Sequence, residues 1–260
     1  LRLPSEAVAK IADPDKTDLS RLIRLYLAVP DGKHRDAAAR TVVQVCAKAQ
    51  QGTDISSLVI EFAPEEAAAK RADMLPLLGR LGGPEALAAI EAAVKDADPD
   101  VREAAVRALC NWPDASVAPR LIELAQADAH PEHRVALLRA LVRVAPLPDG
   151  RTDAERLALL QKAMALCTRD AERTLVLRRA AAIRTVETLR FLLPYLDTPH
   201  AAAACQTVVE LAHHRTLREP NKAEFDRALD RVIETSKDAT VIDRAGRYKK
   251  GQTWAAPAKP

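Results

Sequence analysis

Arginine recurs at fixed places in a series of amphipathic segments, and its guanidinium is well suited to bidentate binding of carboxylate or phosphate groups. Aligning the segments separates two registers. The first contains the arginine at the second position of each segment: Arg35, Arg71, Arg102, Arg134 and Arg173. The second lies five residues further on, at Arg40, Arg107, Arg139 and Arg178, with Arg80 and Arg143 one helical turn beyond it. Both registers indicate recognition of anionic groups, either within the protein or on a partner.

The other reactive residue types form no recognisable catalytic pattern. The sequence contains no G-x-S-x-G, no G-x-x-x-x-G-K-[ST], no G-x-G-x-x-G and no H-E-x-x-H. The histidines and cysteines lack the spacing of convergent zinc ligands. Each cysteine lies in an apolar helical segment, where a free thiol behaves as a small hydrophobe. We therefore expect no catalytic, metal-binding or cofactor-binding residue, and four buried thiols at Cys46, Cys110, Cys167 and Cys205.

The composition favours an all-α protein. Helix-forming Ala, Leu, Arg and Glu dominate, whereas aromatic residues make up 3% of the chain and only 8 residues are glycine. The 39 basic and 36 acidic residues leave a net charge of +3, so no large positive field favours nucleic acid or an anionic membrane. No apolar run reaches the length of about 18 residues that a membrane span requires.

An amphipathic helical segment recurs along most of the chain, at intervals of 28 to 43 residues. Its clearest copy occupies 96–112 and reads DADPDVREAAVRALCNW. The copies open at His34, Lys70, Val101, His133, Glu172, His200 and Asp243. A second apolar segment precedes each copy, at 19–28, 55–62, 84–95, 117–127, 154–167, 186–196 and 222–235. Repeated antiparallel helix pairs of this length are typical of helical solenoids, because one pair alone cannot bury its apolar stripe.

The predicted fold is therefore all-α, a right-handed α-solenoid of about six to seven antiparallel helix pairs. We expect a single solenoid domain over residues 16–247. An N-terminal extension over 1–15 precedes it, and a flexible tail or linker over 248–260 follows it.

Stacked pairs should bury Leu109 in one core with its equivalents Leu141 and Val42. Trp112 is expected to pack in that core, with an exposed contact to a partner as the alternative. Trp254 lies in the tail, where it either docks on the last repeat or faces a module outside this sequence.

The clearest copy resembles a HEAT repeat, in the short form that also occurs in phycobilisome lyases. The motif is a helix, a D-x-D-x-x-V-R loop and an A-A-x-A-L helix, matched by Asp98, Asp100, Val101, Arg102, Ala104, Ala105, Ala108 and Leu109. The resemblance covers most of residues 16–245. A narrower resemblance, to bacterial HEAT domains associated with sugar-hydrolase-like or haem-binding modules, implies an extracytoplasmic (periplasmic) accessory domain, with the cytoplasm as the alternative.

The HEAT resemblance implies a role for each arginine register. The first would pack near loop acids of its own or the neighbouring unit, as Arg102 with Asp98 and Asp100. This structural ladder comprises Arg35, Arg71, Asp98, Asp100, Arg102, Arg134 and Arg173. In HEAT arrays the second helix of each pair lines the concave face, so a candidate concave binding surface comprises Arg40, Arg80, Arg107, Arg139, Arg143 and Arg178. The alternative for this second set is a solvated helix face neutralised by nearby glutamates.

Three hypotheses about function follow. The first is a non-catalytic scaffold that binds another protein, or docks a fused or neighbouring catalytic domain, through its concave face; an acidic partner would complement the arginines. The second is a HEAT-like nucleic-acid-binding enzyme of the alkylpurine DNA glycosylase type, against which stand the two tryptophans and the small net charge. The third, a chromophore lyase, has no identifiable site. We expect a monomer without a cofactor.

Overall fold

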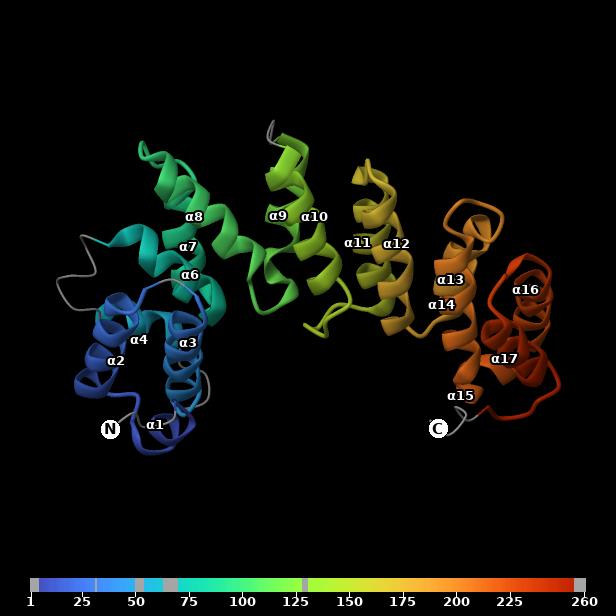
Figure 1. Cartoon of the computed structure of the whole chain (residues 1–260), viewed down its shortest axis with the longest axis horizontal. Helices are drawn as coiled ribbons and strands as arrows, with labels where there is room; N and C mark the ends of the chain where they lie inside the picture. The colour runs from blue at the N-terminus through green and yellow to red at the C-terminus, as the bar shows by residue number, and fades with distance from the viewer. Residues whose placement is uncertain (1–4, 31, 50–53, 63–69, 128–130, 255–260) are drawn as a thin grey trace. The chain divides into compact units, whose positions relative to one another are not determined.

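The computed structural model describes residues 5–30, 32–49, 54–62, 70–127 and 131–254, with the side chains of 5, 6, 131 and 132 left out (Figure 1). Contacts between residues divide the chain into two compact units, Leu1–Val117 and Ala118–Pro260. Each unit buries its own set of apolar side chains.

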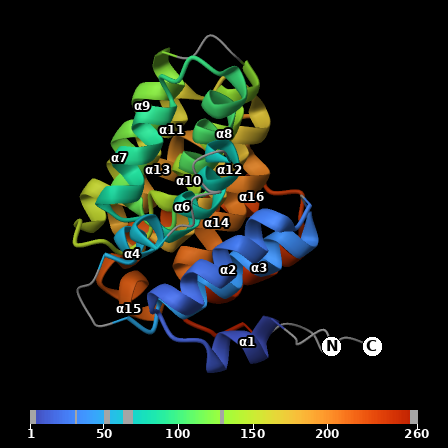
Figure 2. The ribbon, with the colours of Figure 1, turned by 90° about the vertical axis from the view of Figure 1, so that its left-hand side faces the viewer.

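The first unit consists of helices joined by short connections. Its elements are α1 (Ser5–Ile11), α2 (Lys16–Ala28), α3 (Lys33–Cys46), α4 (Ile55–Glu61), α6 (Arg71–Leu81), α7 (Pro84–Ala93), α8 (Pro99–Cys110) and the 3-10 helix η1 (Ala115–Val117). Helices α2 and α3 lie side by side, as Figure 2 shows, and α7 and α8 form a second such pair. Helix α6 packs against both α3 and α8, so the second helices of successive pairs form a layer.

The second unit continues the same pairing. Its elements are α9 (Ala118–Ala127), α10 (Pro131–Val144), α11 (Asp153–Leu166), α12 (Asp170–Arg179), η2 (Ala180–Ala182), α13 (Val186–Leu192), η3 (Leu193–Tyr195), α14 (Ala201–His213), α15 (Arg215–Arg218), η4 (Glu219–Asn221), α16 (Lys222–Thr235) and α17 (Ala239–Lys249). Helix α10 packs on α12, α12 on α14 and α14 on α17. These four inner helices form one layer, and α9, α11, α13 and α16 pack against it.

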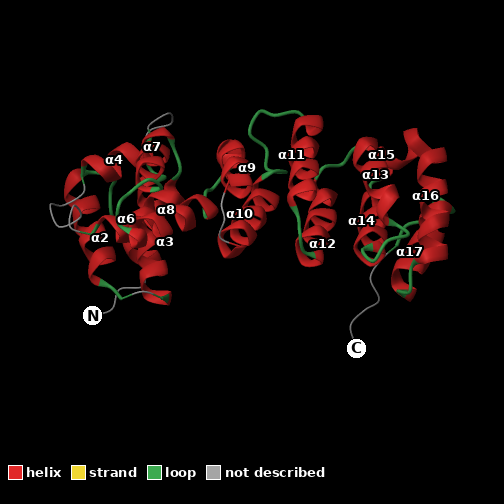
Figure 3. Ribbon diagram, turned by 90° about the horizontal axis from the view of Figure 1, so that it is seen from above, coloured by secondary structure: helices red, strands yellow, loops and turns green. Residues whose placement is uncertain are grey.

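The periodicity of apolar residues explains why these segments are helical. In α2 the buried residues are Leu19, Leu22, Ile23, Tyr26 and Leu27, which occupy one helical face. The side chain of Asp15 accepts a hydrogen bond from the Asp18 amide at 2.8 Å and so caps the start of that helix. The described residues contain no strand (Figure 3), and the all-α prediction is confirmed.

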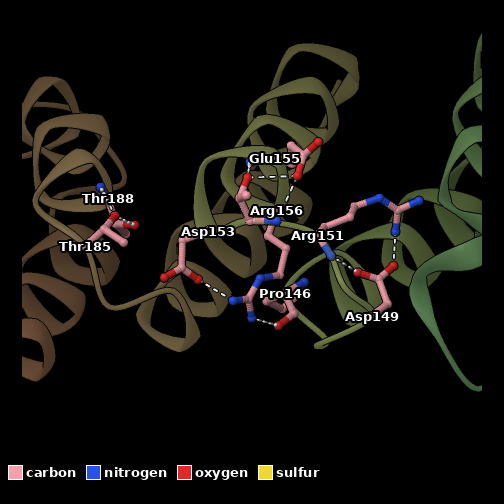
Figure 4. A network of polar contacts seen from close by, with 9 residues as sticks. Pro146, Asp149, Arg151, Asp153, Glu155, Arg156, Thr185 and Thr188 are labelled. Carbon is pink, nitrogen blue, oxygen red and sulfur yellow. Dashed lines mark hydrogen bonds and ion pairs between the residues drawn. The ribbon is translucent and has the colours of Figure 1, made fainter.

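The connection between α10 and α11 illustrates how the loops are held (Figure 4). Gly150 adopts a positive φ of 88°, which glycine reaches without steric cost. Thr152 and Glu155 form a reciprocal capping box at the start of α11. Arg156 donates to the carbonyl of Pro146 at 3.3 Å and also pairs with Asp153. The polar groups of this loop thus bind one another and act structurally.

The predicted helix pairs agree with the observed ones, although some boundaries differ and the short elements α15 and η4 were not predicted. Helix α13 ends at Leu192 and continues as η3, because Pro194 has no amide hydrogen to donate. Helix α17 begins at Ala239, before the predicted start at Asp243, because Asp238 caps it by accepting from the Thr240 amide at 2.8 Å. The predicted N-terminal extension contains a helix, α1, which packs against α3.

The predicted core residues are buried. Val42 and Leu109 are 0% exposed in the first unit, and Leu141 is 0% exposed in the second. Trp112 is 1% exposed and its indole Nε1 donates to Ser116 Oγ at 2.9 Å, which confirms the core assignment. None of the described helices combines the length and apolar character that a membrane span requires.

Candidate functional site

The first arginine register binds the ends of helices. Arg35 donates to the carbonyl of Val29 at 2.8 Å, Arg102 to that of Asp96 at 2.7 Å, and Arg173 to that of Cys167 at 3.0 Å. Each acceptor lies at or just beyond the end of the preceding helix. Carbonyls at a helix C-terminus lack intrahelical partners, and the helix dipole is negative there. A guanidinium six residues further along the chain donates a hydrogen bond to such a carbonyl and places a positive charge at the negative end of the dipole.

This geometry corrects the predicted partners of Arg102. Its guanidinium donates to the carbonyls of Asp96 and Ala97 in place of the carboxylates of Asp98 and Asp100. Asp98 instead caps α8, accepting from the Asp100 amide at 2.9 Å. A short polar side chain before a helix accepts from the nearest free backbone amide, so the carboxylate of Asp98 binds the start of its own helix and not Arg102.

The other ladder arginines use carboxylates, carbonyls or both. Arg35 pairs with Asp73 of α6 at 2.7 Å, and Arg71 pairs with Asp96, so acids of a neighbouring pair do contribute. Arg134 donates to the carbonyl of Leu166, the last residue of α11, at 3.1 Å. The ladder residues contact structural partners, although the effect of removing them stays a prediction.

In the first unit, two arginines of the second register pair with acids. Arg80 pairs with Asp36, and Arg107 lies 3.3 Å from Glu103 on the same helix. Arg40 is exposed on α3. Here the arrangement matches the neutralised helix face that was the alternative to a binding surface.

In the second unit, one arginine of the same register lines a basic pocket. Arg139 of α10 pairs at 3.3 Å with Glu172, a carboxylate that is 2% exposed. Arg143 is exposed at the end of the same helix. Arg178 of α12 lines a pocket of about 350 Å³, so it alone of the six predicted surface residues belongs to this cavity.

The pocket lies where the ends of α12 and α14 approach α17. Arg178 and Arg179 come from the last turn of α12, Arg184 from the segment after η2, and Arg244 from α17. Ala181 and Ala182 of η2 form part of the wall, and their small side chains leave room for a ligand. Helix α12 packs against α14, and α14 against α17, so all these elements belong to one packed group.

Glu210, His213 and His214 of the α14 region complete the wall. Glu210 accepts from Gln206 Nε2 at 2.9 Å. His213 Nδ1 lies 2.9 Å from the hydroxyl of Tyr248. Burial, then the charge of Arg184 and then His213, hold the pKa of His214 below its usual value. Burial of the imidazole and, after it, the neighbouring positive charge thus both disfavour protonation of His214.

The family follows from the repeats together with a comparison of sequences. Models of HEAT repeats match residues 55–141 and, in a second overlapping match, residues 87–182. The chain contains HEAT repeats.

Two solved structures, both titled as crystal structures of an engineered protein, are similar to this HEAT-repeat chain. One is 19% identical, with 95% of this chain and 70% of that chain covered and a TM-score of 0.41. The other is 18% identical, with 91% and 98% covered and a TM-score of 0.40. No curated protein matches the HEAT-repeat sequence.

Several pocket residues of the HEAT-repeat chain were absent from the sequence-based prediction. Arg179 and Arg184 fall outside the aligned registers, and Arg244 belongs to the weakest repeat copy. The adjacent pair His213-His214, directly before Arg215, was a local signal of a basic end to that helix. Only the packing of α14 on α17 brings these positions to one cavity.

The remaining sequence-based expectations concern thiols and the tail of the HEAT-repeat chain. Cys46, Cys167 and Cys205 are buried and Cys110 is partly exposed, all as free thiols. Burial raises the pKa of Cys46 and of Cys167 to about 11, so both are protonated and unreactive at neutral pH. Trp254 docks on the last repeat, since the guanidinium of Arg244 lies 4.8 Å from its ring.

No group of three or more His, Cys, Asp or Glu residues able to hold a metal ion occurs within the described ranges.

Proposed function

We propose that this HEAT-repeat chain is a non-catalytic scaffold that binds an acidic partner protein through the inner helices of its second unit. HEAT repeats are typical of proteins that mediate interactions between proteins, and their fold supplies a layered helical surface. The proposal goes further, by assigning the binding surface to α10, α12, α14 and α17.

One observation carries the proposal. Several arginines of the second unit pair with acids, as Arg190 does with Glu224 at 2.7 Å, Arg231 does with Asp197, and Arg247 of the inner helix α17 does with Asp243 at 3.0 Å. By contrast, Arg178 and Arg184 have no carboxylate partner among the described residues, and Arg244 lies over aromatic rings. Cations left without internal acids on one surface are suited to bind an acidic partner.

The test is a binding measurement with the partner that the chain captures from its native extract. Once that protein is purified, we expect the Arg178→Glu/Arg184→Glu variant to weaken its affinity at least about tenfold, with most of the loss disappearing at high salt. A control variant, Arg227→Glu/Lys237→Glu, makes the same change of charge on and after α16 and should retain affinity. Equal losses in both variants would reduce the effect to net charge and contradict a binding surface on the inner helices.

A further inference from the structure

The basic pocket of the second unit, defined by Arg178, Arg179, Arg184 and Arg244 around about 350 Å³, concentrates positive charge on one point. Four guanidiniums line it together with a single carboxylate, that of Glu210. They come from α12, from the segment after η2 and from α17, so they converge through tertiary packing. Sequential neighbours on one helix face would not produce this arrangement.

The guanidiniums of the pocket retain donor capacity. Arg179 uses one terminal nitrogen to donate to the carbonyl of Arg143 at 3.1 Å, while its Nε is buried without a hydrogen-bond partner among the described residues. The Nε of Arg244 is likewise buried and unsatisfied within the described ranges. Buried donors without an acceptor are energetically costly, so these two side chains are not fully satisfied within the described residues.

The side chains are also held in place before any ligand arrives. Arg244 stacks over the rings of Tyr248 and Trp254, at 5.9 and 4.8 Å from its Cζ to the ring centroids. Tyr248 is itself buried and lies 2.9 Å from His213 Nδ1. A guanidinium fixed by stacking loses less conformational entropy on binding than one in free solution.

The number of donors indicates which anion is complementary. One carboxylate has two oxygens and one negative charge, and a single arginine can satisfy it in a bidentate pair. A phosphate monoester carries a charge of about −1.5 to −2 and three acceptor oxygens, and arginine clusters are the usual protein site for it. We propose that the basic pocket binds a phosphate monoester, carried on a phosphorylated side chain of the partner protein, through Arg178, Arg184 and Arg244.

The ends of α12 and α14 provide a competing explanation for these arginines. Basic residues in the last turn of a helix are favoured by its dipole, which accounts for the presence of Arg178 and Arg179. The dipole does not account for Arg184, which follows η2, or for Arg244, which is in the middle of α17. Their convergence on one cavity is what the phosphate site explains.

This inference rests on the proposed scaffold function only for the origin of the phosphate group. The pocket can be tested with small probes that need no partner. If probes bind and the captured protein does not depend on Arg178 and Arg184, the scaffold proposal fails alone. If the captured protein depends on them and probes do not bind, the phosphate assignment fails alone.

The experiment is calorimetric titration of the full chain with N-acetyl-O-phosphoserine amide, inorganic phosphate and N-acetylglutamate amide. We expect the phosphoserine probe to bind at least about tenfold more tightly than the glutamate probe, because it presents an additional oxygen and about one more charge. The Arg178→Gln/Arg184→Gln variant should reduce that affinity at least about tenfold. Both side chains are exposed, so the variant should fold, and circular dichroism checks this.

Two controls complete the test. Arg227→Gln/Lys237→Gln removes the same charge outside the pocket and should bind the phosphoserine probe as wild type does. Arg244→Gln, a third variant, should also lose affinity. Equal affinity for the phosphoserine and glutamate probes, or unchanged binding in Arg178→Gln/Arg184→Gln, would overturn the assignment. Tighter binding of inorganic phosphate than of the phosphoserine probe would contradict the proposal that the bound phosphate group is carried on a protein side chain.

Discussion

Individual arginines of this chain differ in function according to the acceptor that packing places beside them. Arg102 binds carbonyls at the end of the preceding helix, Arg190 binds a carboxylate of a neighbouring helix, and Arg178 faces an open pocket. The side chain is the same in each case. A position in the repeat therefore does not by itself determine whether an arginine stabilises the fold or binds a ligand.

Removing Arg102 should lower stability. Arg102→Ala leaves the carbonyls of Asp96 and Ala97 without this donor, and because the contacts are exposed we expect a loss of about 0.5–1 kcal/mol. Thermal unfolding by circular dichroism measures the change. Arg107→Ala is the matched control on the same helix, since Arg107 is 67% exposed and pairs only at 3.3 Å with Glu103. A melting temperature equal to that of wild type in Arg102→Ala would refute the ladder role.

Binding to the basic pocket should strengthen as pH falls. The pKa of His214 is lowered in the folded protein by burial, Arg184 and His213, so its protonation in the free protein is disfavoured. The other charged groups that line the pocket are Arg178, Arg179, Arg244 and Glu210. A bound anion favours protonated His214, and linkage requires that protonation favour the anion equally.

Sulfate is the suitable probe for this dependence because it does not titrate in the relevant range. Its affinity should rise as pH is lowered through and below the ordinary His pKa of 6.5, as measured by calorimetry. His214→Gln should flatten the profile. The same lowered pKa makes the unfolded chain bind more protons than the folded one below that value, so stability without sulfate should fall on acidification. A profile unchanged by His214→Gln would assign the dependence to another group.

Among the helices of the first unit, the close packing of α6 against α8 depends on one glycine. A Cβ on Gly79 of α6 would lie 2.8 Å from the Cα of Ala108 on α8 and closer still to its carbonyl oxygen. Both residues are buried. The two helix backbones can approach this far only because position 79 has no side chain.

Gly79→Ala should therefore destabilise the chain by about 2–3 kcal/mol, since the backbones of α6 and α8 must separate. Gly246→Ala is the matched control: this helical glycine of α17 has open space within 4 Å. That change should stabilise the chain by about 0.5–1 kcal/mol through helix propensity. Urea denaturation measures both, and a neutral Gly79→Ala would contradict the tight α6–α8 packing.

For the molecule as a whole, charge and aromatic exposure bear on the nucleic-acid hypothesis. The net charge is +3. Trp112 is 1% exposed and Trp254 is covered in part by Arg244. Trp112 therefore offers no free face on which a base could stack, and Arg244 occupies part of the surface of Trp254.

We expect only nonspecific binding to duplex DNA in a mobility-shift assay, with a Kd of about 10⁻⁴–10⁻⁶ M at physiological salt and no preference for a damaged duplex. Duplexes with and without an alkylated purine provide the comparison. Selective retention of the alkylated duplex, together with release of the base, would support the glycosylase hypothesis in place of the scaffold.

The sequence by itself determined the helix pairs, because apolar residues at helical spacing form one face of a helix, and that face must be buried whichever neighbouring helix covers it. The burial of Leu19, Leu22 and Ile23 of α2 follows from that rule. The resemblance of residues 96–112 to a HEAT repeat was also visible in the sequence, and the match to HEAT-repeat models confirmed it.

Only the tertiary structure decided which polar groups meet. Arg102 donates to a backbone carbonyl and not to the acids beside it in sequence, because the carboxylate of Asp98 caps α8. Arg178 and Arg244 are 66 positions apart in sequence yet line one pocket, because α14 packs between α12 and α17. Spacing in the sequence specifies a side chain's face on its own helix, whereas its partner depends on which helices pack together.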